Sequence, residues 1–306
     1  MINIVICTHN RSESLKQTLS SLRETAVSLD LRWYLTVVDN NSGDQTKAVV
    51  EQFAASAPFP IHYVFEGRPG LSYARNTGIE KSTGDIIAFI DDDVTVEKDW
   101  LINLQAAFEK YDCIAVGGRI YPVWPGPKPS WFHEQGPFAT PKAIVYFDLG
   151  DKVCVPESHP YGANMAFRRE AFAKYGTFRV DLGRVANALM GGEDIEFFER
   201  LKKGGERILY VPDVVVYHPV TKDRLDKNYF ESWCFNAARS AVRFEGLPKR
   251  AVYYFGLPRF YFRDLLENLA KYLVTFDSDR RFYYKLQICI LAGRIVETRR
   301  SRECIH

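Results

Sequence analysis

The chain has 306 residues, of which 46% are hydrophobic and 25% are charged. These values are typical of a globular protein with a large core, in one domain or in one domain with an appendage. A formal net charge of +2 excludes a polycation built for nucleic acid.

The charge is unevenly spread along the chain. Residues 243–306 contain 13 Lys or Arg and 7 Asp or Glu, a net charge of +6. A basic tail on a mildly acidic body predicts contact with an anionic partner such as a membrane surface. The six dispersed cysteines predict reduced thiols in a cytoplasmic protein. Without a basic leader or 18 consecutive apolar residues, we expect no signal peptide and no membrane-spanning helix.

The first 110 residues predict alternating strands and helices. Apolar runs predict strands at 2–7, 33–38, 61–65 and 86–90. The helices between them are predicted to begin near Ser12, to pass through 49–53, and to cover 71–79. Near-continuous apolar strands separated by helices predict an α/β fold, in which a mostly parallel sheet is covered on both faces. Such a sheet binds its ligand at the carboxyl ends of the strands.

The rest of the chain is predicted to differ in character. Six prolines and two tryptophans in 121–141 predict an irregular loop over the site. Order resumes near Ala163, with a helix after Glu193 and strands at 208–211 and 214–217. An apolar stripe at 262–276 predicts helices after Asn228. The predicted domains are therefore an α/β domain, 1–225, whose character changes after residue 110, followed by a helical, basic C-terminal extension, 226–306.

Three consecutive carboxylates, Asp91, Asp92 and Asp93, follow the strand predicted at 86–90. Clustered carboxylates repel one another unless a cation lies between them. Oxygen ligands favour a hard divalent cation, Mn²⁺ or Mg²⁺. The alternative is an acidic turn that caps the next helix.

Other polar residues are predicted to meet at the same edge. Arg75 shares a helix face with Ser72 and would grip a phosphate with two hydrogen bonds, or else pair with a surface carboxylate. The first strand is followed by Thr8, Asn10 and Arg11, and the second by Asp39 and Asn41. The Asp39 carboxylate would accept the imide N–H of uracil or thymine, or else form a simple turn.

Two acidic residues, Glu193 and Asp194, open a predicted helix, where the helix dipole favours negative charge. One of them would act as a general base, or both would simply cap the helix.

Six segments in this order resemble the family-2 glycosyltransferases, which have the GT-A fold. They are residues 5–11 (VICTHNR), 37–42 (VVDNNS), 74–78 (ARNTG), 89–93 (FIDDD), 162–164 (GAN) and 192–194 (GED). The resemblance covers roughly residues 1–220 and implies that the domain 1–225 is catalytic, with a nucleotide-binding half, 1–110, and an acceptor-binding half, 111–225, that includes the proline-rich loop. It implies an inverting enzyme that moves a sugar from a nucleotide diphosphate donor, UDP-linked on the hint of Asp39, to an acceptor hydroxyl.

The resemblance also implies roles for single residues at the donor. Thr8, Arg11 and Asp39 would line the base and ribose, together with Asn10 and Asn41, and Arg75 would approach the diphosphate. Asp91 would contact the ribose or bound water, and Asp93 would hold the metal, with Asp92 able to share.

At the acceptor side, Asp194 matches the catalytic base and Glu193 would orient the acceptor. His218 matches a position that supplies a further metal ligand in some relatives, although a lone histidine is more often structural. Asn164 would lie near the sugars. Trp131, in the proline-rich loop, would stack on a sugar ring or only bury the loop.

The tail carries a separate expectation. Its aromatic stripe and arginine pairs would rest on anionic lipid at the inner face of the membrane, where lipid-linked acceptors lie, or pack on the catalytic domain or on a second subunit of a homodimer. The acceptor would be a glycan, a lipid-linked glycan or another hydroxyl compound.

Two rival readings remain. Residues 91–95 (DDDVT) also fit the nucleophile motif of haloacid-dehalogenase phosphohydrolases, although there the motif follows the first strand. The other rival is an inactive nucleotide-sugar-binding module, against which the intact Asp194 and Asp93 argue.

Overall fold

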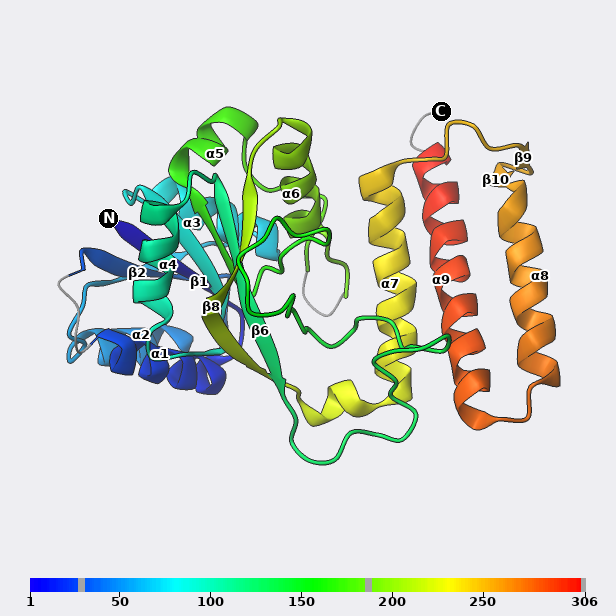
Figure 1. The fold of residues 1–306 in the computed structure, drawn as a ribbon, viewed down its shortest axis with the longest axis horizontal. Coiled ribbons are helices and arrows are strands. Elements are labelled where there is room, and N and C mark those ends of the chain that lie inside the picture. The colour runs from blue at the N-terminus through cyan, green and yellow to red at the C-terminus, as the bar shows by residue number, and fades with distance from the viewer. Residues whose placement is uncertain (27–30, 185–188, 304–306) are drawn as a thin grey trace. The chain divides into compact units, whose positions relative to one another are not determined.

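A computed structural model describes residues 1–26, 31–184 and 189–303. Its main feature is an eight-stranded sheet with the strand order β3-β2-β1-β4-β7-β6-β8-β5, with helices on both faces (Figure 1). The strands are β1 Ile2–Thr8, β2 Trp33–Asp39, β3 Ile61–Phe65, β4 Ile86–Asp91, β5 Thr95–Val96, β6 Ala115–Val123, β7 Asn164–Arg168 and β8 Ile208–Pro219. The helices that belong to the sheet are α1 Ser12–Ala26, α2 Thr46–Ala54, α3 Leu71–Lys81, α4 Trp100–Lys110, α5 Arg169–Tyr175 and α6 Glu193–Lys203.

The sheet is mostly parallel, as the sequence predicts. The strands β3, β2, β1 and β4 run parallel, and β6 is parallel to β8. The strand β7 lies between these two groups and is antiparallel to both β4 and β6. The carboxyl ends of β1, β2 and β4 therefore meet the beginning of β7 at one edge.

The core lies on both faces of the sheet because successive side chains of a strand point in opposite directions. Ile4 and Ile6 of β1 belong to the apolar cluster that contains α1, α2 and α4 side chains. Val5 belongs to the cluster on the other face, with side chains of α3, α5 and α6. Because both faces of the sheet are covered, the strands have nearly continuous apolar sequences.

Two predicted boundaries are wrong. The two strands expected at 208–211 and 214–217 are one strand, β8, whose partner β6 shifts register between Gly118 and Arg119. The irregular stretch expected at 121–141 begins only after Val123, because β6 continues through Pro122. Ile120 donates its N–H to Phe147 O, away from β8, and Pro122 lies two residues on with the same orientation. The missing N–H of Pro122 therefore removes no bond of the β6–β8 ladder.

By their contacts, the described residues form two compact units. The first contains residues 1–123, 145–186 and 193–219, and the second contains 124–144, 187–192 and 220–306. The proline-rich loop, predicted within the catalytic domain, thus groups with the C-terminal helices. The second unit consists of a short 3-10 helix Lys222–Leu225, α7 Lys227–Glu245, the hairpin strands β9 Tyr253–Tyr254 and β10 Leu257–Pro258, α8 Arg259–Val274 and α9 Ser278–Glu303.

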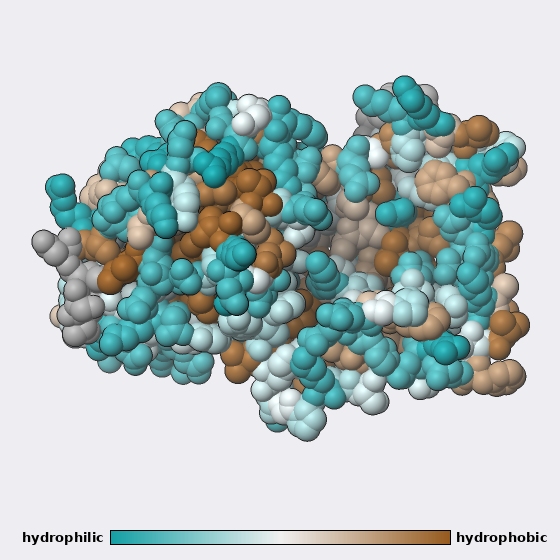
Figure 2. Space-filling view, viewed as in Figure 1, coloured by the Kyte–Doolittle hydropathy of each residue, from teal (hydrophilic) through white to brown (hydrophobic). Residues whose placement is uncertain are grey.

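Within this second unit, α9 packs against both α7 and α8 (Figure 1). Its core includes Phe230, Cys234, Phe282 and Leu286. Hydrophobic surface remains visible along α8 (Figure 2). Within the described ranges, every helix is too short or too polar to cross a lipid bilayer.

Candidate active site

The strand ends bring the predicted donor residues together. Thr8 of β1 pairs with Asp39 of β2, and Cys7 pairs with Asp91 of β4. On the other side of β4, Ile90 pairs with Asn164 of β7. The segments that follow β1, β2 and β4 and the segment that precedes β7 therefore lie at the same edge of the sheet.

Two carboxylates and an imidazole form a cluster at this edge. One ligand atom each from Asp91, Asp93 and His218 lies within 4.8 Å of the other two. His218 Nε2 is 3.5 Å from Asp93 Oδ1 and 3.9 Å from Asp91 Oδ2. The β8 strand supplies His218, and its pairing with β6 places this residue beside Pro122.

The orientation of His218 suits a metal ligand. Its side chain is buried, and Nδ1 lies 3.1 Å from the carbonyl oxygen of Pro219. A carbonyl only accepts hydrogen bonds, so this contact suits an N–H at Nδ1 and directs Nε2 toward the two carboxylates. Three electron-rich atoms that face one another fit a cation between them, and a backbone bond that orients a ligating histidine is common.

Arg11 pairs with the other carboxylates of the triple. Its Nη1 donates to Asp92 Oδ1 at 3.1 Å and to Asp93 Oδ2 at 2.8 Å. Burial raises the pKa of Asp92 to about 7, although Arg11 opposes this shift. Arg11, predicted at the base and ribose, thus contacts the aspartates in this structure.

The loops after β1 and β2 are tied to each other. Asn10 Oδ1 accepts the N–H of Gly43 at 2.7 Å, and Asn10 N–H donates to Ser42 Oγ at 2.9 Å. Asn10 and Asn41 both have a positive φ, 54° and 60°, which asparagine tolerates better than most residues. Two of the predicted donor residues therefore shape the backbone of this rim.

Asp39 forms a turn, which was the alternative to base binding in the sequence analysis. Its Oδ1 accepts the N–H of Ser42 at 2.9 Å, and its Oδ2 accepts the hydroxyl of Tyr63 at 2.8 Å. A carboxylate has about four lone-pair sites, so these two bonds leave room for a ligand N–H.

Arg75 lies beneath the edge and joins the two acidic groups. The side chain is 4% exposed, its Nη1 forms an ion pair with Glu193 Oε1, and its Nη2 is 3.9 Å from Asp91 Oδ1. A side chain at Gly162 would collide with the guanidinium, so the glycine leaves room for it. Burial, with the neighbouring Asp194 charge, raises the pKa of Glu193, and Arg75 opposes this shift.

Asp194 is held by backbone groups at the same edge. Its Oδ2 accepts the N–H of Gly162 at 2.9 Å, and its Oδ1 accepts the N–H of Ile195 at 2.9 Å. Gly162 lies two residues before Asn164, which pairs with the end of β4. Asp194 and the Asp91–Asp93–His218 cluster are therefore on the same side of the sheet, with Arg75 between them.

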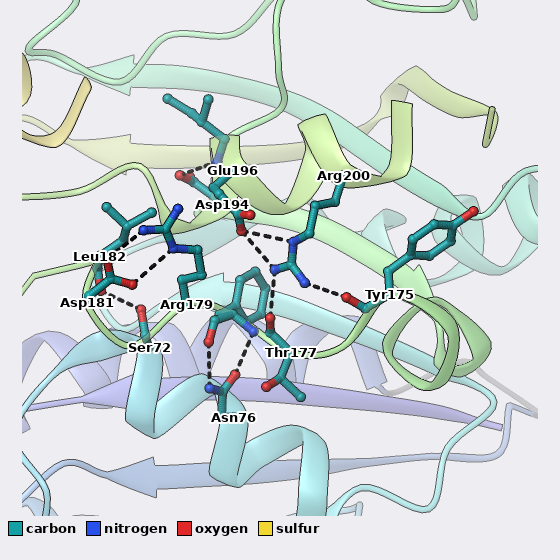
Figure 3. Close-up of polar contacts among 12 residues, drawn as sticks. Ser72, Asn76, Tyr175, Thr177, Arg179, Asp181, Leu182, Asp194, Glu196 and Arg200 are labelled. Carbon is teal, nitrogen blue, oxygen red and sulfur yellow. Dashed lines mark hydrogen bonds and ion pairs between the residues drawn. The ribbon is translucent and has the colours of Figure 1, made fainter. Parts of the chain in front are cut away.

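A polar framework fixes the start of α6, from which Asp194 projects (Figure 3). Asn76 of α3 exchanges two hydrogen bonds with the backbone of Phe178, at 2.8 and 2.9 Å. Arg200 of α6 donates to Thr177 O at 2.7 Å, and its guanidinium pairs with Glu196. The loop between α5 and α6 is thus fastened to both α3 and α6. The sequence analysis quoted Asn76 within a motif without giving it a role.

Two predicted acceptor residues lie elsewhere. Asn164 is buried, and its amide is engaged by Trp100 Nε1 and by the carbonyls of Arg119 and Val214. It fastens β7 to its neighbours, and contact with a sugar stays a prediction. Trp131 packs edge-on against Phe230 and Phe282 in the second unit. This contact matches the predicted alternative in which the tryptophan buries the proline-rich loop.

Sequence reasoning missed Asn40, which is buried beside Asp39. Its Oδ1 accepts the N–H of Gly70, and its Nδ2 donates to Arg68 O, both at 2.7 Å. These bonds position the turn before α3 and hence Arg75. An asparagine directly after a buried strand is the signal that would have found it.

The fold is that of the GT-A glycosyltransferases. A mannosyltransferase from Pyrobaculum calidifontis, solved in complex with GDP-Man and Mn²⁺, superposes with a TM-score of 0.63 at 17% identity, over 97% of this chain and 86% of that one. Staphylococcus aureus TarS, residues 1–349, superposes with a TM-score of 0.52 at 15% identity, over 99% and 91% of the two chains.

Sequence comparison gives the family. The model for glycosyl transferase family 2 matches residues 3–176. A glucosyl-dolichyl phosphate glucuronosyltransferase of Haloferax volcanii is 31% identical over 236 residues, which cover 74% of this chain and 71% of that protein. The succinoglycan biosynthesis protein ExoM of Rhizobium meliloti is 32% identical over 224 residues, covering 73% and 68%. The chain belongs to glycosyl transferase family 2, whose members act on nucleotide sugars.

Proposed function

We propose that this chain is an inverting, divalent-cation-dependent glycosyltransferase that moves a sugar from a UDP-linked donor to a hydroxyl of a glycan or lipid-linked acceptor. One observation carries the proposal: Arg75 is in contact with both Asp91 of the metal-ligand cluster and Glu193, the neighbour of Asp194. A donor diphosphate and an acceptor hydroxyl would therefore meet at this edge.

Asp194 is the general base of the proposed reaction. A hydroxyl is a poor nucleophile until a base takes its proton, and a positioned carboxylate contributes about 10²- to 10⁴-fold in rate. Two backbone N–H groups fix the Asp194 carboxylate without neutralising it. Direct attack by the activated hydroxyl inverts the anomeric carbon. Burial raises the pKa of the nearby Cys7 thiol to about 12, which keeps this thiol from competing as a nucleophile.

Asp91, Asp93 and His218 would hold Mn²⁺ or Mg²⁺. The Nε2 atom of His218 faces the two carboxylates, which supports this assignment, and Mn²⁺ accompanies GDP-Man in the structurally similar mannosyltransferase. A bound divalent cation supplies positive charge for the leaving nucleoside diphosphate. Arg75, Arg11 and the rim asparagines would then position the donor around it.

The donor and acceptor classes follow from the site and from the relatives. The remaining lone pairs of Asp39 favour a base with an imide N–H, which uracil offers. The Haloferax relative is named for a dolichyl phosphate substrate and the Rhizobium relative for succinoglycan synthesis. Both names support an acceptor from polysaccharide or glycolipid synthesis at the cell envelope.

A panel of nucleotides and nucleotide sugars, with and without Mn²⁺, tests this function by thermal shift. We expect UDP compounds to raise the melting temperature only when the cation is present, since ligands that bind the folded state stabilise it. The Asp93→Ala variant should lose the cation-dependent part of the shift. A shift of equal size for this variant, or for UDP alone, would contradict the metal assignment.

Turnover with a suitable acceptor separates the enzyme from its inactive alternative. We expect acceptor-dependent release of UDP from the donor, and inversion at the anomeric carbon by NMR of the product. Donor binding without release across a broad acceptor panel would favour an inactive binding module. The family match already excludes the phosphohydrolase reading.

A further inference from the structure

One stretch of the second unit combines basic and aromatic residues without acidic ones. Residues 246–263, named here the aromatic–basic segment, contain four Lys or Arg, no Asp or Glu, and six Tyr or Phe. The segment includes the β9–β10 hairpin and the first turn of α8. Neither the sheet nor the proposed chemistry uses these residues.

The tip of the hairpin presents a phenylalanine in an unfavourable backbone conformation. Tyr254 pairs with Leu257, so the loop between the strands is Phe255-Gly256, with φ of 49° and 79°. A two-residue loop with two positive φ values normally takes Asn-Gly, because bulky side chains are disfavoured there. The Phe255 side chain is nevertheless 94% exposed and gains no packing in exchange.

Exposed apolar side chains continue along α8 beyond the hairpin. Leu266 is 68% exposed, Leu273 is 73% exposed, and Phe276, just after the helix, is fully exposed. Leu266 and Leu273 are seven residues apart and so lie on the same face of α8. The visible edge of α8 in Figure 2 shows this hydrophobic surface. A patch of this kind on a protein surface marks an interaction site.

We propose that the hairpin tip and this face of α8 dock on an anionic lipid surface, with Phe255 inserted at the boundary between head groups and acyl chains. Aromatic side chains favour that boundary, and basic side chains beside them attract anionic head groups. Lys249, Arg250, Arg259 and Arg263 supply four positive charges. Among the residues that the structure describes, Arg263 is the one of these four that forms an ion pair, with Asp264.

The same charges disfavour a second copy of the chain as the occupant. A two-fold dimer places a patch against its own copy, so four positive charges would face four more. An anionic membrane instead turns each of these charges into an attraction.

Vesicle binding of the full-length chain tests the proposal without any donor or acceptor, so its outcome is independent of the proposed enzymatic reaction. Co-sedimentation is measured with vesicles of phosphatidylcholine alone and with vesicles in which about a third of the lipid is phosphatidylglycerol. We expect binding to the anionic vesicles, which weakens as salt is added because the charges are screened. Equal binding to both vesicle types would overturn the electrostatic part of the proposal.

The decisive variant is Phe255→Asn, which suits the backbone of the turn and removes the apolar tip. We expect the variant to fold at least as stably as the parent chain and to bind anionic vesicles about tenfold more weakly, from the loss of one buried aromatic side chain. The Arg250→Gln variant should weaken binding about fivefold, the effect of one basic residue near an anionic surface.

Val155→Asn is the matched control, since Val155 is an apolar residue that is 62% exposed in the sheet unit. Its vesicle binding should equal that of the parent chain. Parent-like vesicle binding by Phe255→Asn would overturn the proposal. A concentration-dependent dimer that dissociates in Phe255→Asn, with no vesicle binding by the parent, would assign the patch to a second copy instead.

Discussion

Arg75 carries a charge that is compensated entirely inside the protein. It lies between Glu193 and Asp91 and over the ring of Phe178, with its guanidinium 5.6 Å from the ring centroid. A charge buried to this extent persists only with partners, and the loss of one member leaves the other uncompensated. Arg75 therefore supports the fold as well as the site.

Replacing this arginine tests that role. We expect Arg75→Met to lower the free energy of unfolding by about 3 kcal/mol or more, because Glu193 then stays buried without its cation. Urea unfolding followed by fluorescence measures the change. The double variant Arg75→Met with Glu193→Gln should recover part of the stability. A single variant as stable as the parent would show that the pair contributes nothing.

Asp194→Asn changes the proposed base with almost no change in shape. We expect donor affinity to remain within about twofold and the rate of transfer to fall by about 10²- to 10⁴-fold, since an amide takes no proton from the acceptor. Isothermal titration with the donor and an acceptor assay give the two quantities. Transfer at the parental rate would refute the assignment of the base.

Glu66 predicts a pH dependence of stability. Hydrogen bonds from Arg68, together with one from Thr77, lower the pKa of this buried carboxyl from 4.5 to about 2. A pKa lowered by folding stabilises the protein at pH values above 4.5, and this contribution is lost as the pH falls toward 2. Because Arg68 is itself exposed, we expect a loss of only about 2 kcal/mol.

Denaturant unfolding over this pH range measures the effect. The Glu66→Gln variant lacks the titrating group, so its stability should fall less steeply with acid. If the free energies of unfolding of the parent and the variant fall equally with pH, Glu66 does not cause the pH dependence.

At the scale of single residues, the sequence predicted well which side chains lie close together. It predicted less well which partner each side chain contacts. Asp91, Asp93 and His218 come together because parallel strands end at one edge, which an apolar pattern reveals. The partners of Arg75 depend on the turn before α6 and on a glycine at 162, which belong to distant segments. The same holds for Asn164, whose amide is engaged by three separate elements.

At the scale of elements, the contact between α7 and α9 depends on one glycine. A β-carbon at Gly293 would collide with the carbonyl oxygen of Phe235. Alanine ordinarily stabilises a helix interior by about 1 kcal/mol over glycine. We expect the opposite sign for Gly293→Ala, a loss of about 1–3 kcal/mol, because the two helices must move apart.

Thermal unfolding of the variant checks this sign. Gly126→Ala is the matched control, since an added carbon at Gly126 meets no atom within 4 Å and its φ is not positive. The control should melt with the parent chain. A Gly293→Ala variant that melts higher than the parent would mean that the helices accommodate the methyl group.

Helices and strands with a clear apolar pattern could be predicted from the sequence. Those whose bounds depend on a neighbouring element could not. The strands β1 to β4 and the helices between them follow from apolar runs and turn residues. The sequence analysis gave no range for the helix α4, which follows the acidic turn and the two-residue strand β5. β8 is one continuous strand because its pairing with β6 shifts register between Gly118 and Arg119. The sequence of β8 alone does not reveal this shift, because it depends on the partner strand.

At the scale of the whole molecule, the predicted division at residue 225 follows chain order, whereas the contacts group segments that are distant in sequence. Residues 124–144 join the C-terminal helices through Trp131 and its aromatic neighbours. Proline content indicates that this stretch is irregular but not which core its tryptophan enters. The sequence gives the net charge of the tail directly, but it does not predict the positive φ of Phe255 at the hairpin tip.

The position of β7 and β8 in the sheet has a consequence for synthesis on the ribosome. Asp91 and Asp93 emerge early, but His218, their neighbour in space, is made 125 residues after Asp93. The strand β7, which lies between β4 and β6 in the sheet, also follows both of them in the chain. A nascent polypeptide therefore displays its acidic residues well before the imidazole can join them, and the proposed cation site is complete only in chains that have been synthesised beyond His218.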